Sequence, residues 1–293
     1  MLIVVAGSTG LIGRALVSEL RAAGHKVRRL VRREPAAEDE YFWDPPSGIM
    51  AEDVFDGVEA VVNLCGSSVQ GRWNAARKRQ IRDSRIEPAR LLAGAVAKYG
   101  VPTLLNASSV SFYGDTGDAP ADEDSGRGEG FLAQMVVDWE AATSAASDAG
   151  SRVALLRTGL VLAPDCGLLS TLRPMVRFGL GGRLGDGGQY VAWISLTDQV
   201  AAIRFLLDHG EVGGPVNLVA PGPVTNAELT EALGRAMDRR VVLTVPEPVV
   251  RLVLGESADE LALISLRITP RVLGESGYAF RHTDFAAALA EAL

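Results

Sequence analysis

The sequence has little of what metal sites and disulfide frameworks require. It contains two cysteines, Cys65 and Cys166, and three histidines that stand far apart and form no HxxxH-type pair. Zinc sites need clustered Cys and His ligands, and small secreted domains need several cysteine pairs. We therefore expect no metal site and no disulfide framework, and the expected location is the reducing cytoplasm.

Positive charge and long apolar runs are scarce as well. The chain carries 29 Lys and Arg against 36 Asp and Glu, a net charge of −7, whereas a nucleic-acid partner requires a basic stripe. No apolar segment approaches the roughly 20 residues of a membrane-spanning helix. We expect neither nucleic acid nor a membrane as a partner.

The first half of the chain does contain a regular alternation of short apolar runs with helical patterns. This is typical of a parallel sheet covered by helices on both faces. The expected strands are Leu2–Ala6, Val27–Val31, Ala60–Cys65, Thr103–Ala107 and Val153–Leu156. One expected helix starts at Leu11, a long one runs from about Asn74 to Tyr99, and a third runs from Phe131 to near Gly150.

Beyond residue 160 the pattern changes. The segment 179–188 holds six glycines and is expected to be either a lid over a substrate or an irregular connection. A strand is expected at Tyr190–Ile194, and Thr197 is expected to cap a helix at Val200–Leu207. A further strand at Val216–Val219 is expected to return to the main sheet.

The sequence thus predicts the α/β class: a Rossmann-type, doubly wound parallel sheet with a smaller α/β C-terminal lobe. The dinucleotide-binding domain is expected to comprise residues 1–164 and about 189–220, and the substrate-side lobe residues 165–188 and 221–293. A cleft is expected between the two. Trp193 is expected either to line that cleft or to pack in the core, and the acidic stretch Asp115–Asp124 is expected to be a solvated loop at its mouth.

A glycine-rich loop follows the first expected strand, at Gly7-Ser8-Thr9-Gly10-Leu11-Ile12-Gly13. Gly7 permits a tight turn, Gly10 lets the backbone approach a pyrophosphate, and Gly13 lets helix and strand pack closely. The exposed N–H groups and the positive helix end then hold the anion. Residues 7–12 are therefore expected to bind a dinucleotide; an ordinary strand–helix turn is the alternative.

The end of the second expected strand indicates which dinucleotide is bound. NAD sites usually place an acidic residue there, to accept a hydrogen bond from the ribose 2′-hydroxyl. This chain has Arg32 and Arg33 instead, and no carboxylate until Glu34. Because guanidinium groups pair well with phosphate, the two arginines favour the 2′-phosphate of NADP(H), the alternative being a solvated turn.

These residues resemble the short-chain dehydrogenase/reductase superfamily in its extended and atypical branch, which has the GxxGxxG spacing of Gly7, Gly10 and Gly13. More narrowly, the chain resembles the epimerase-like family (NAD-dependent epimerase/dehydratase, nucleoside-diphosphate-sugar epimerase type) that has a small characteristic C-terminal domain. The resemblance covers essentially the whole chain. It is carried by Asn63-Leu64-Cys65-Gly66, Arg72-Trp73, Ser84-Arg85, Ser108-Ser109, Tyr113-Gly114, Trp139-Glu140, Arg157–Leu162, Gly179–Gly182, Trp193-Ile194, Pro215–Leu218, Ala220-Pro221 through Thr225-Asn226, and Pro270-Arg271.

The resemblance implies a cofactor path along the carboxyl ends of the strands. Leu64, Cys65 and Gly66 would lie against the adenosine and its ribose. Ser108 would lie near the nicotinamide ribose and Leu160 near the nicotinamide. Two residues of the long helix, Gln80 and Arg85, would face the cofactor. The superfamily often dimerises through such helices, which makes a homodimer one possible oligomer, but the exposed faces of the helices in this sequence are not diagnostic of it.

The superfamily's catalytic Tyr and Lys, spaced YxxxK on one helix face, are absent here. No tyrosine has a lysine four residues later, and the helix where the pair belongs has Phe131 and Met135 at this spacing. Ser109 occupies the place of the superfamily's catalytic serine, although its hydroxyl is as well explained by a backbone contact. Tyr113 is the other candidate proton donor, with a structural role as the alternative.

Two functions are therefore open. The chain is either an NADP(H)-dependent oxidoreductase or epimerase-like enzyme with an altered acid/base set, acting on an unknown small carbonyl or sugar-like substrate, or a non-catalytic NADP(H)-binding sensor or partner-binding module. The missing dyad favours the second, and the expected cleft beside a second lobe favours the first.

Overall fold

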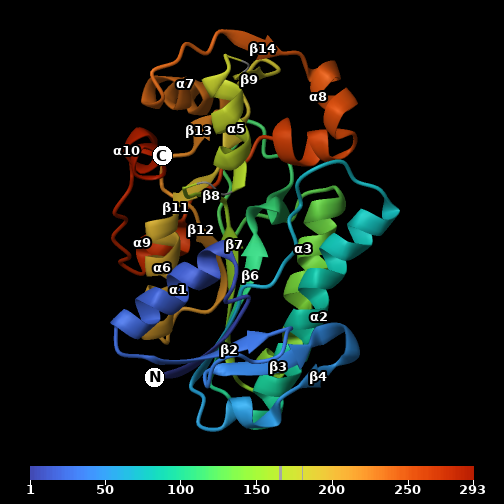
Figure 1. Ribbon diagram of the computed structural model, residues 1–293, viewed down its shortest axis with the longest axis vertical. Helices are drawn as coiled ribbons and strands as arrows, with labels where there is room; N and C mark the ends of the chain where they lie inside the picture. The colour runs from blue at the N-terminus through green and yellow to red at the C-terminus, as the bar shows by residue number, and fades with distance from the viewer. Residues whose placement is uncertain (165–166, 180) are drawn as a thin grey trace.

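The computed structural model describes residues 1–164, 167–179 and 181–293. Its centre is an eight-stranded sheet, parallel except between its last two strands (Figure 1). Across the sheet the strands are β12 (Gly214–Leu218), β7 (Arg152–Thr158), β6 (Thr103–Ser109), β5 (Ala60–Asn63), β1 (Leu2–Ala6), β2 (Lys26–Val31), β3 (Glu40–Asp44) and β4 (Ile49–Met50). The predicted Rossmann class is confirmed.

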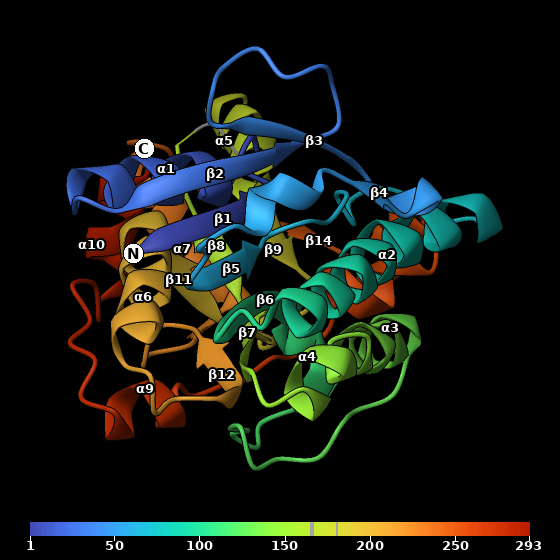
Figure 2. The ribbon, with the colours of Figure 1, turned by 90° about the horizontal axis from the view of Figure 1, so that it is seen from below.

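Helices cover both faces of this sheet (Figure 2). One layer holds α1 (Leu11–Ala22), α6 (Leu196–Asp208) and α9 (Arg271–Glu275), and the other holds α2 (Ala75–Tyr99), α3 (Phe131–Ala141) and α4 (Ser144–Asp148). The sequence of strand β1 is apolar throughout because both of its faces are buried. Ile3 and Val5 pack in the core cluster of the first layer, and Val4 and Ala6 in that of the second, because successive side chains of a strand point to opposite faces.

Local sequence signals fix the long helix. The Asn74 side chain accepts a hydrogen bond from the backbone N–H of Arg77 at 2.8 Å, and Gly100 ends the helix in the left-handed conformation with φ +63°. The predicted span from Asn74 to Tyr99 is confirmed. Among residues 1–164, 167–179 and 181–293, no helix combines the length and hydropathy that crossing a membrane requires.

Three expectations about element boundaries were wrong. Ser195, not Thr197, caps α6: its hydroxyl accepts from the N–H of Asp198 at 3.0 Å, and the helix begins four residues earlier than expected. The third expected helix stops at Ala141, and α4 continues after a turn. The expected strand Tyr190–Ile194 divides into β10 (Tyr190–Val191) and β11 (Trp193–Ser195), which pair with different strands.

The edge strands β3 and β4 were not predicted at all. Strand β3 begins with Glu40, a residue type disfavoured in strands. Its buried carboxylate is neutralised by Arg29 at 3.1 Å and Arg33 at 2.6 Å. A local signal for this strand was present in the consecutive aromatic residues Tyr41, Phe42 and Trp43, but the flanking acidic residues obscured it, since the arginines that neutralise Glu40 are seven or more residues away in sequence.

An apolar cluster lies above the sheet in Figure 1, formed by segments beyond residue 160. The elements of this region are β8 (Leu160–Leu162), α5 (Gly167–Arg177), β9 (Gly182–Leu184), β13 (Val224–Thr225), α7 (Asn226–Ala236), β14 (Leu243–Val245), α8 (Glu247–Leu254), η4 (Ala258–Ala262) and α10 (Phe285–Glu291). The predicted division into two domains stays a prediction. Trp193 packs in this core, edge-on to Phe285 at 5.2 Å, and donates to the carbonyl of Gly222 at 2.6 Å. Part of the glycine-rich segment forms β9, which pairs with β14; Leu180 in this segment and Cys166 lie outside the described residues.

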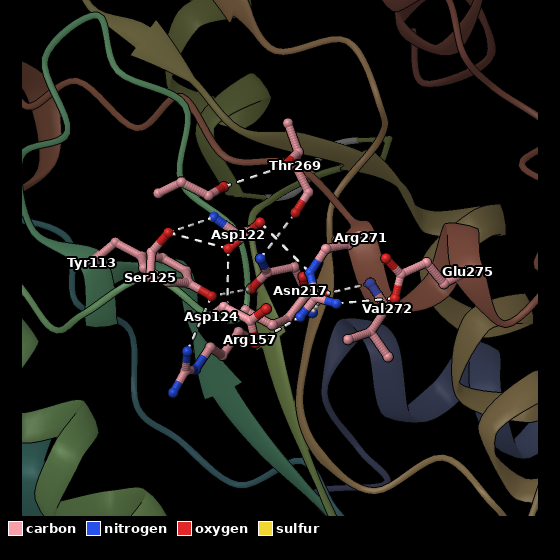
Figure 3. A network of polar contacts seen from close by, with 12 residues as sticks. Tyr113, Asp122, Asp124, Ser125, Arg157, Asn217, Thr269, Arg271, Val272 and Glu275 are labelled. Atoms are coloured by element: carbon pink, nitrogen blue, oxygen red, sulfur yellow. Dashed lines mark hydrogen bonds and ion pairs between the residues drawn. The ribbon is translucent and has the colours of Figure 1, made fainter.

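The acidic stretch 115–124 is exposed over most of its length, as its composition indicated, but it is anchored near its end. Ala121 forms a parallel bridge with Ile268, and Glu123 is only 7% exposed. The Glu123 carboxylate accepts from the backbone N–H groups of Asn217 at 2.9 Å and Val272 at 3.3 Å. Glu123 therefore ties this loop both to β12 and to the C-terminal segment, and Figure 3 shows the neighbouring contacts of Asp122 and Asp124 with Arg271.

Glu123 predicts a pH dependence of stability. Burial raises the pKa of its carboxyl above the ordinary value of 4.5. The folded state thus binds this proton more tightly than the unfolded state does. The contribution of Glu123 to the free energy of unfolding is therefore fully present below pH 4.5 and is lost as the pH rises through the raised pKa of the folded state. Glu123→Gln cannot titrate, so its unfolding free energy relative to wild type is expected to increase from acidic to neutral pH. Urea unfolding across that range measures it; a constant difference would contradict the prediction.

Candidate functional site

Three backbone segments meet closely at the carboxyl end of β1. Gly7 adopts φ +76°, and a Cβ there would stand 2.7 Å from the carbonyl oxygen of Leu64. A Cβ on Gly13 would stand 2.2 Å from the carbonyl oxygen of Gly7. The turn and the close packing that the sequence indicated for these glycines are both present.

A cleft of about 730 Å³ opens beside this loop. It brings together segments that are far apart in the sequence: the glycine loop, the end of β2, the loop after β5 and one side of α2. Of the predicted cofactor residues, the lining contains Gly7, Thr9, Gly10, Arg32, Arg33, Leu64, Cys65, Gly66 and Gln80. It does not contain Ser8, Leu11, Ile12, Arg85, Ser108 or Leu160.

The loop has polar groups that a pyrophosphate would satisfy. The Ser8 hydroxyl is buried, and no hydrogen-bond partner for it exists among the described residues. Helix α1 begins at Leu11 with no side-chain cap at Gly10 and no acidic residue in its first turn. An uncapped helix start with free N–H groups favours an anion. The residues present therefore fit the phosphates of a dinucleotide.

The two arginines after β2 have different surroundings. Arg33 donates to the Glu40 carboxylate at 2.6 Å and to the carbonyl of Glu34 at 2.8 Å. Arg32 is exposed, lines the cleft and has no hydrogen bond or ion pair within the described part of the chain. Of the two, only the Arg32 side chain is thus free to bind a ligand in the cleft. The sequence analysis had assigned Arg32 and Arg33 the same role.

The loop after β5 is held by Arg85 from behind. Arg85 donates to the carbonyls of Ser67 at 3.0 Å and Ile81 at 2.9 Å, and burial lowers the pKa of its guanidinium to about 10. Its guanidinium carbon would lie 3.2 Å from a Cβ on Gly66. Burial also raises the pKa of the Cys65 thiol to about 12, so this thiol stays protonated. Arg85 supports the cleft wall and does not line it.

The two candidate serines, Ser108 and Ser109, are the last residues of β6 and have different surroundings. Ser108 is 5% exposed, and its hydroxyl donates to the Glu140 carboxylate at 2.5 Å. Ser109 is half-buried and caps the short helix η3 (Val110–Tyr113), accepting from the N–H of Ser111 at 3.1 Å. The proposed contact of Ser108 with a nicotinamide ribose stays a prediction, and its buried position argues against it.

Tyr113 is a member of a buried polar network. Its hydroxyl donates to Asn217 Oδ1 at 2.7 Å and accepts from Arg157 at 3.0 Å. Burial raises the pKa of this phenol, whereas a proton donor for catalysis near neutral pH needs a lowered one. This geometry favours the structural alternative for Tyr113.

Apolar side chains fill the positions of the missing dyad. Phe131 is the first residue of α3 and packs edge-on against Trp73 at 5.4 Å, while Met135 is buried. Neither can transfer a proton. No group of three or more His, Cys, Asp or Glu side chains suited to a metal occurs among residues 1–164, 167–179 and 181–293.

Sequence reasoning gave no role to three charged groups that hold the surrounding elements: Glu140, Arg157 and Glu260. Glu140 forms a two-pronged ion pair with Arg157, at 2.9 Å for both contacts. Glu260, from η4, accepts from the N–H groups of Phe131 at 2.9 Å and Leu132 at 2.6 Å and so caps α3. Glu140 and Arg157 belong to the motifs Trp139-Glu140 and Arg157–Leu162, by which the chain resembles its family, so their importance could have been inferred from the sequence. The contact of Glu260 joins residues that are too distant in sequence for any local signal.

Two family descriptions match the chain. The NAD dependent epimerase/dehydratase family matches residues 3–219, and a domain of unknown function, DUF1731, matches residues 245–292. The chain belongs to the NAD dependent epimerase/dehydratase family. It is 50% identical over 288 residues to an epimerase family protein of Mycobacterium tuberculosis, covering 98% of this chain and 96% of that protein. It is 33% identical to the human epimerase family protein SDR39U1, covering 99% of both chains.

Solved structures of family members share the fold. The crystal structure of human SDR39U1 with NADPH matches with a TM-score of 0.90 at 32% identity, over 100% of this chain and 99% of that one. A nucleoside-diphosphate sugar epimerase from Corynebacterium glutamicum matches with a TM-score of 0.83 at 38% identity, over 100% of this chain. This chain spans 58% of the length of the Corynebacterium protein. The predicted resemblance is confirmed.

The close approach at Gly13 makes a stability prediction. Gly13→Ala is expected to destabilise the protein by about 1–3 kcal/mol, because the added methyl group forces the backbone apart. Gly94→Ala is the matched control: this glycine lies within α2, and nothing lies within 4 Å of the place that its methyl group would take, so alanine is expected to stabilise by up to about 1 kcal/mol. Urea unfolding compares them, and a Gly13→Ala variant as stable as wild type would contradict the close contact.

Proposed function

We propose that this protein binds NADP(H) in the cleft beside the glycine loop and acts as an oxidoreductase or epimerase-like enzyme on a small carbonyl or sugar-like substrate. The observation that carries the proposal is an anion-ready loop and an unengaged arginine lining one cleft. The NADPH in the crystal structure of human SDR39U1, whose whole length this chain matches, supports it. The proposal includes neither nucleic acid nor a membrane as a partner.

The residues of this chain divide the binding between them. The N–H groups at the start of α1 and the Ser8 hydroxyl would hold the pyrophosphate. Arg32, exposed at the cleft, would pair with the 2′-phosphate. When bound, the cofactor supplies or accepts the hydride. Ser109, at the carboxyl end of β6, would then donate a hydrogen bond to the substrate oxygen.

A second function is favoured by one observation. Phe131 and Met135 replace the usual Tyr and Lys and are packed into a core with Trp73, so the chain lacks the superfamily's standard proton donor. A protein that binds NADP(H) without turnover, as a sensor, fits this equally well. Binding and turnover therefore need separate tests.

The binding prediction concerns Arg32. Arg32→Ala is expected to weaken NADPH binding about 10- to 100-fold, the value of a charge-assisted hydrogen bond of about 1.5–3 kcal/mol. NADH binding should change little, since NADH lacks the 2′-phosphate. Arg33→Ala is the control, with a smaller effect because Glu40 already engages Arg33. Calorimetric titration measures all of these; equal affinity of the wild type for NADPH and NADH would contradict the assignment.

The turnover prediction concerns Ser109. NADPH consumption with a panel of carbonyl compounds and nucleotide sugars is expected to reveal a substrate, and Ser109→Ala is expected to lower kcat at least about 100-fold. Ser147→Ala, which removes an exposed hydroxyl that donates to the carbonyl of Ser144, should not. Tight NADPH binding with no turnover across the panel would instead support the sensor.

A further inference from the structure

A continuous series of polar contacts runs from the C-terminal segment to the end of β6, and Figure 3 shows its first part, from Thr269 through Asn217 and Tyr113 to Arg157. It begins at the backbone carbonyl of Thr269, which lies in the segment that leads into α9. It passes through Asn217 of β12, Tyr113 of η3 and Arg157 of β7. It ends at Glu140 and Ser108. Each link joins a different structural element to the next.

The direction of every proton in the first half of this chain is determined. A carbonyl can only accept, so the Asn217 group at 3.0 Å from Thr269 O must be the amide nitrogen. The amide oxygen of Asn217 therefore faces Tyr113 and takes the phenol proton at 2.7 Å. The phenol oxygen is left to accept from Arg157. The Tyr113 proton is thus directed away from any substrate.

The second half is equally constrained. Arg157 can only donate, and it grips both oxygens of Glu140. The ionised carboxylate of Glu140 can only accept, so the Ser108 hydroxyl gives its proton to it at 2.5 Å. The guanidinium carbon of Arg157 also lies 3.5 Å from the ring centre of Phe112, so Arg157 contacts η3 at both Phe112 and Tyr113.

Ser109 lies between two residues, Ser108 and Tyr113, whose side chains take part in this series of hydrogen bonds. Its neighbour Ser108 is held by Glu140, and Tyr113, four residues on, is held by Arg157 and Asn217. The Ser109 hydroxyl does not belong to this series of contacts. It accepts from the N–H of Ser111 and donates to the hydroxyl of the same residue, both at 3.1 Å. The contacts at Ser108 and Tyr113 therefore hold the segment on both sides of Ser109, and Ser109 would exchange only its bond to the Ser111 hydroxyl for one to a substrate oxygen.

We infer that the C-terminal segment, through Thr269 and Asn217, positions the Ser109 end of β6 for a substrate, with Tyr113, Arg157 and Glu140 as positioning residues. This rests on the proposed function, in which Ser109 meets the substrate. It gives the middle of the domain of unknown function, which matches residues 245–292, a role at the proposed active site. It also leaves Ser109, and not Tyr113, as the hydroxyl able to donate there.

The test compares two tyrosine variants. Tyr113→Phe removes the central hydroxyl of the chain and keeps the ring. Tyr278→Phe is the matched control, since its hydroxyl also has two short contacts, both with Asp198, on the opposite layer of the sheet. Hydrogen exchange is measured by mass spectrometry on peptides that cover residues 107–114, without cofactor. The emission of bound NADPH is measured separately.

Tyr113→Phe is expected to speed exchange in this segment about tenfold and to change the NADPH emission, with NADPH affinity kept. Tyr278→Phe should do neither. Ser108→Ala, which releases the other end of the chain, is expected to act like Tyr113→Phe and serves if that variant does not fold. The inference is overturned if Tyr113→Phe and Ser108→Ala do not differ from Tyr278→Phe in the exchange of residues 107–114, or do not differ from it in the NADPH emission. Absence of NADPH binding to wild type would instead refute the proposed function, and the exchange comparison would still decide the positioning role.

Discussion

The candidate site depends on the close backbone approach of β1, the start of α1 and the loop after β5. Gly7 and Gly13 leave no room for a methyl group against the carbonyls of Leu64 and Gly7. Because the backbones touch, the first N–H groups of α1 are presented at the head of the sheet instead of being covered by side chains. An anion can approach them only for this reason.

A second constraint acts at the end of β6. The ion pair of Glu140 and Arg157 is buried, and a buried pair gains little net stability, because removing two charges from water costs as much as their attraction returns. The contribution of this ion pair is to orient the groups that hydrogen-bond to it. Glu140 fixes the proton of Ser108, and Arg157 fixes the orientation of Tyr113. Such a pair specifies one arrangement of the strand end where an apolar core would permit several.

Sequence reasoning identified the parts of the fold that local patterns specify. Strand β1 and helix α2 were predicted closely, because apolar runs, Asn74 and Gly100 are local signals. The glycine loop was recognisable for the same reason. Strand β3 was missed although its three aromatic residues are strand formers, because acidic residues flank them, and the burial of Glu123 was missed because an acidic stretch is ordinarily solvated. Their charges are satisfied by partners distant along the chain, and only the folded structure brings these together.

The loss of the Tyr–Lys dyad is accompanied by a different organisation of the same region. Phe131 and Met135 make the start of α3 apolar, and Glu260 from the C-terminal domain caps its N–H groups. The domain at residues 245–292 thus contacts α3 directly through Glu260, and through Thr269 and Asn217 it is linked to Tyr113 in η3, which follows β6. These contacts constrain the relative geometry of α3 and the end of β6 whether or not protons are transferred there. Fixing this geometry is a physical task that the enzyme and the sensor would share.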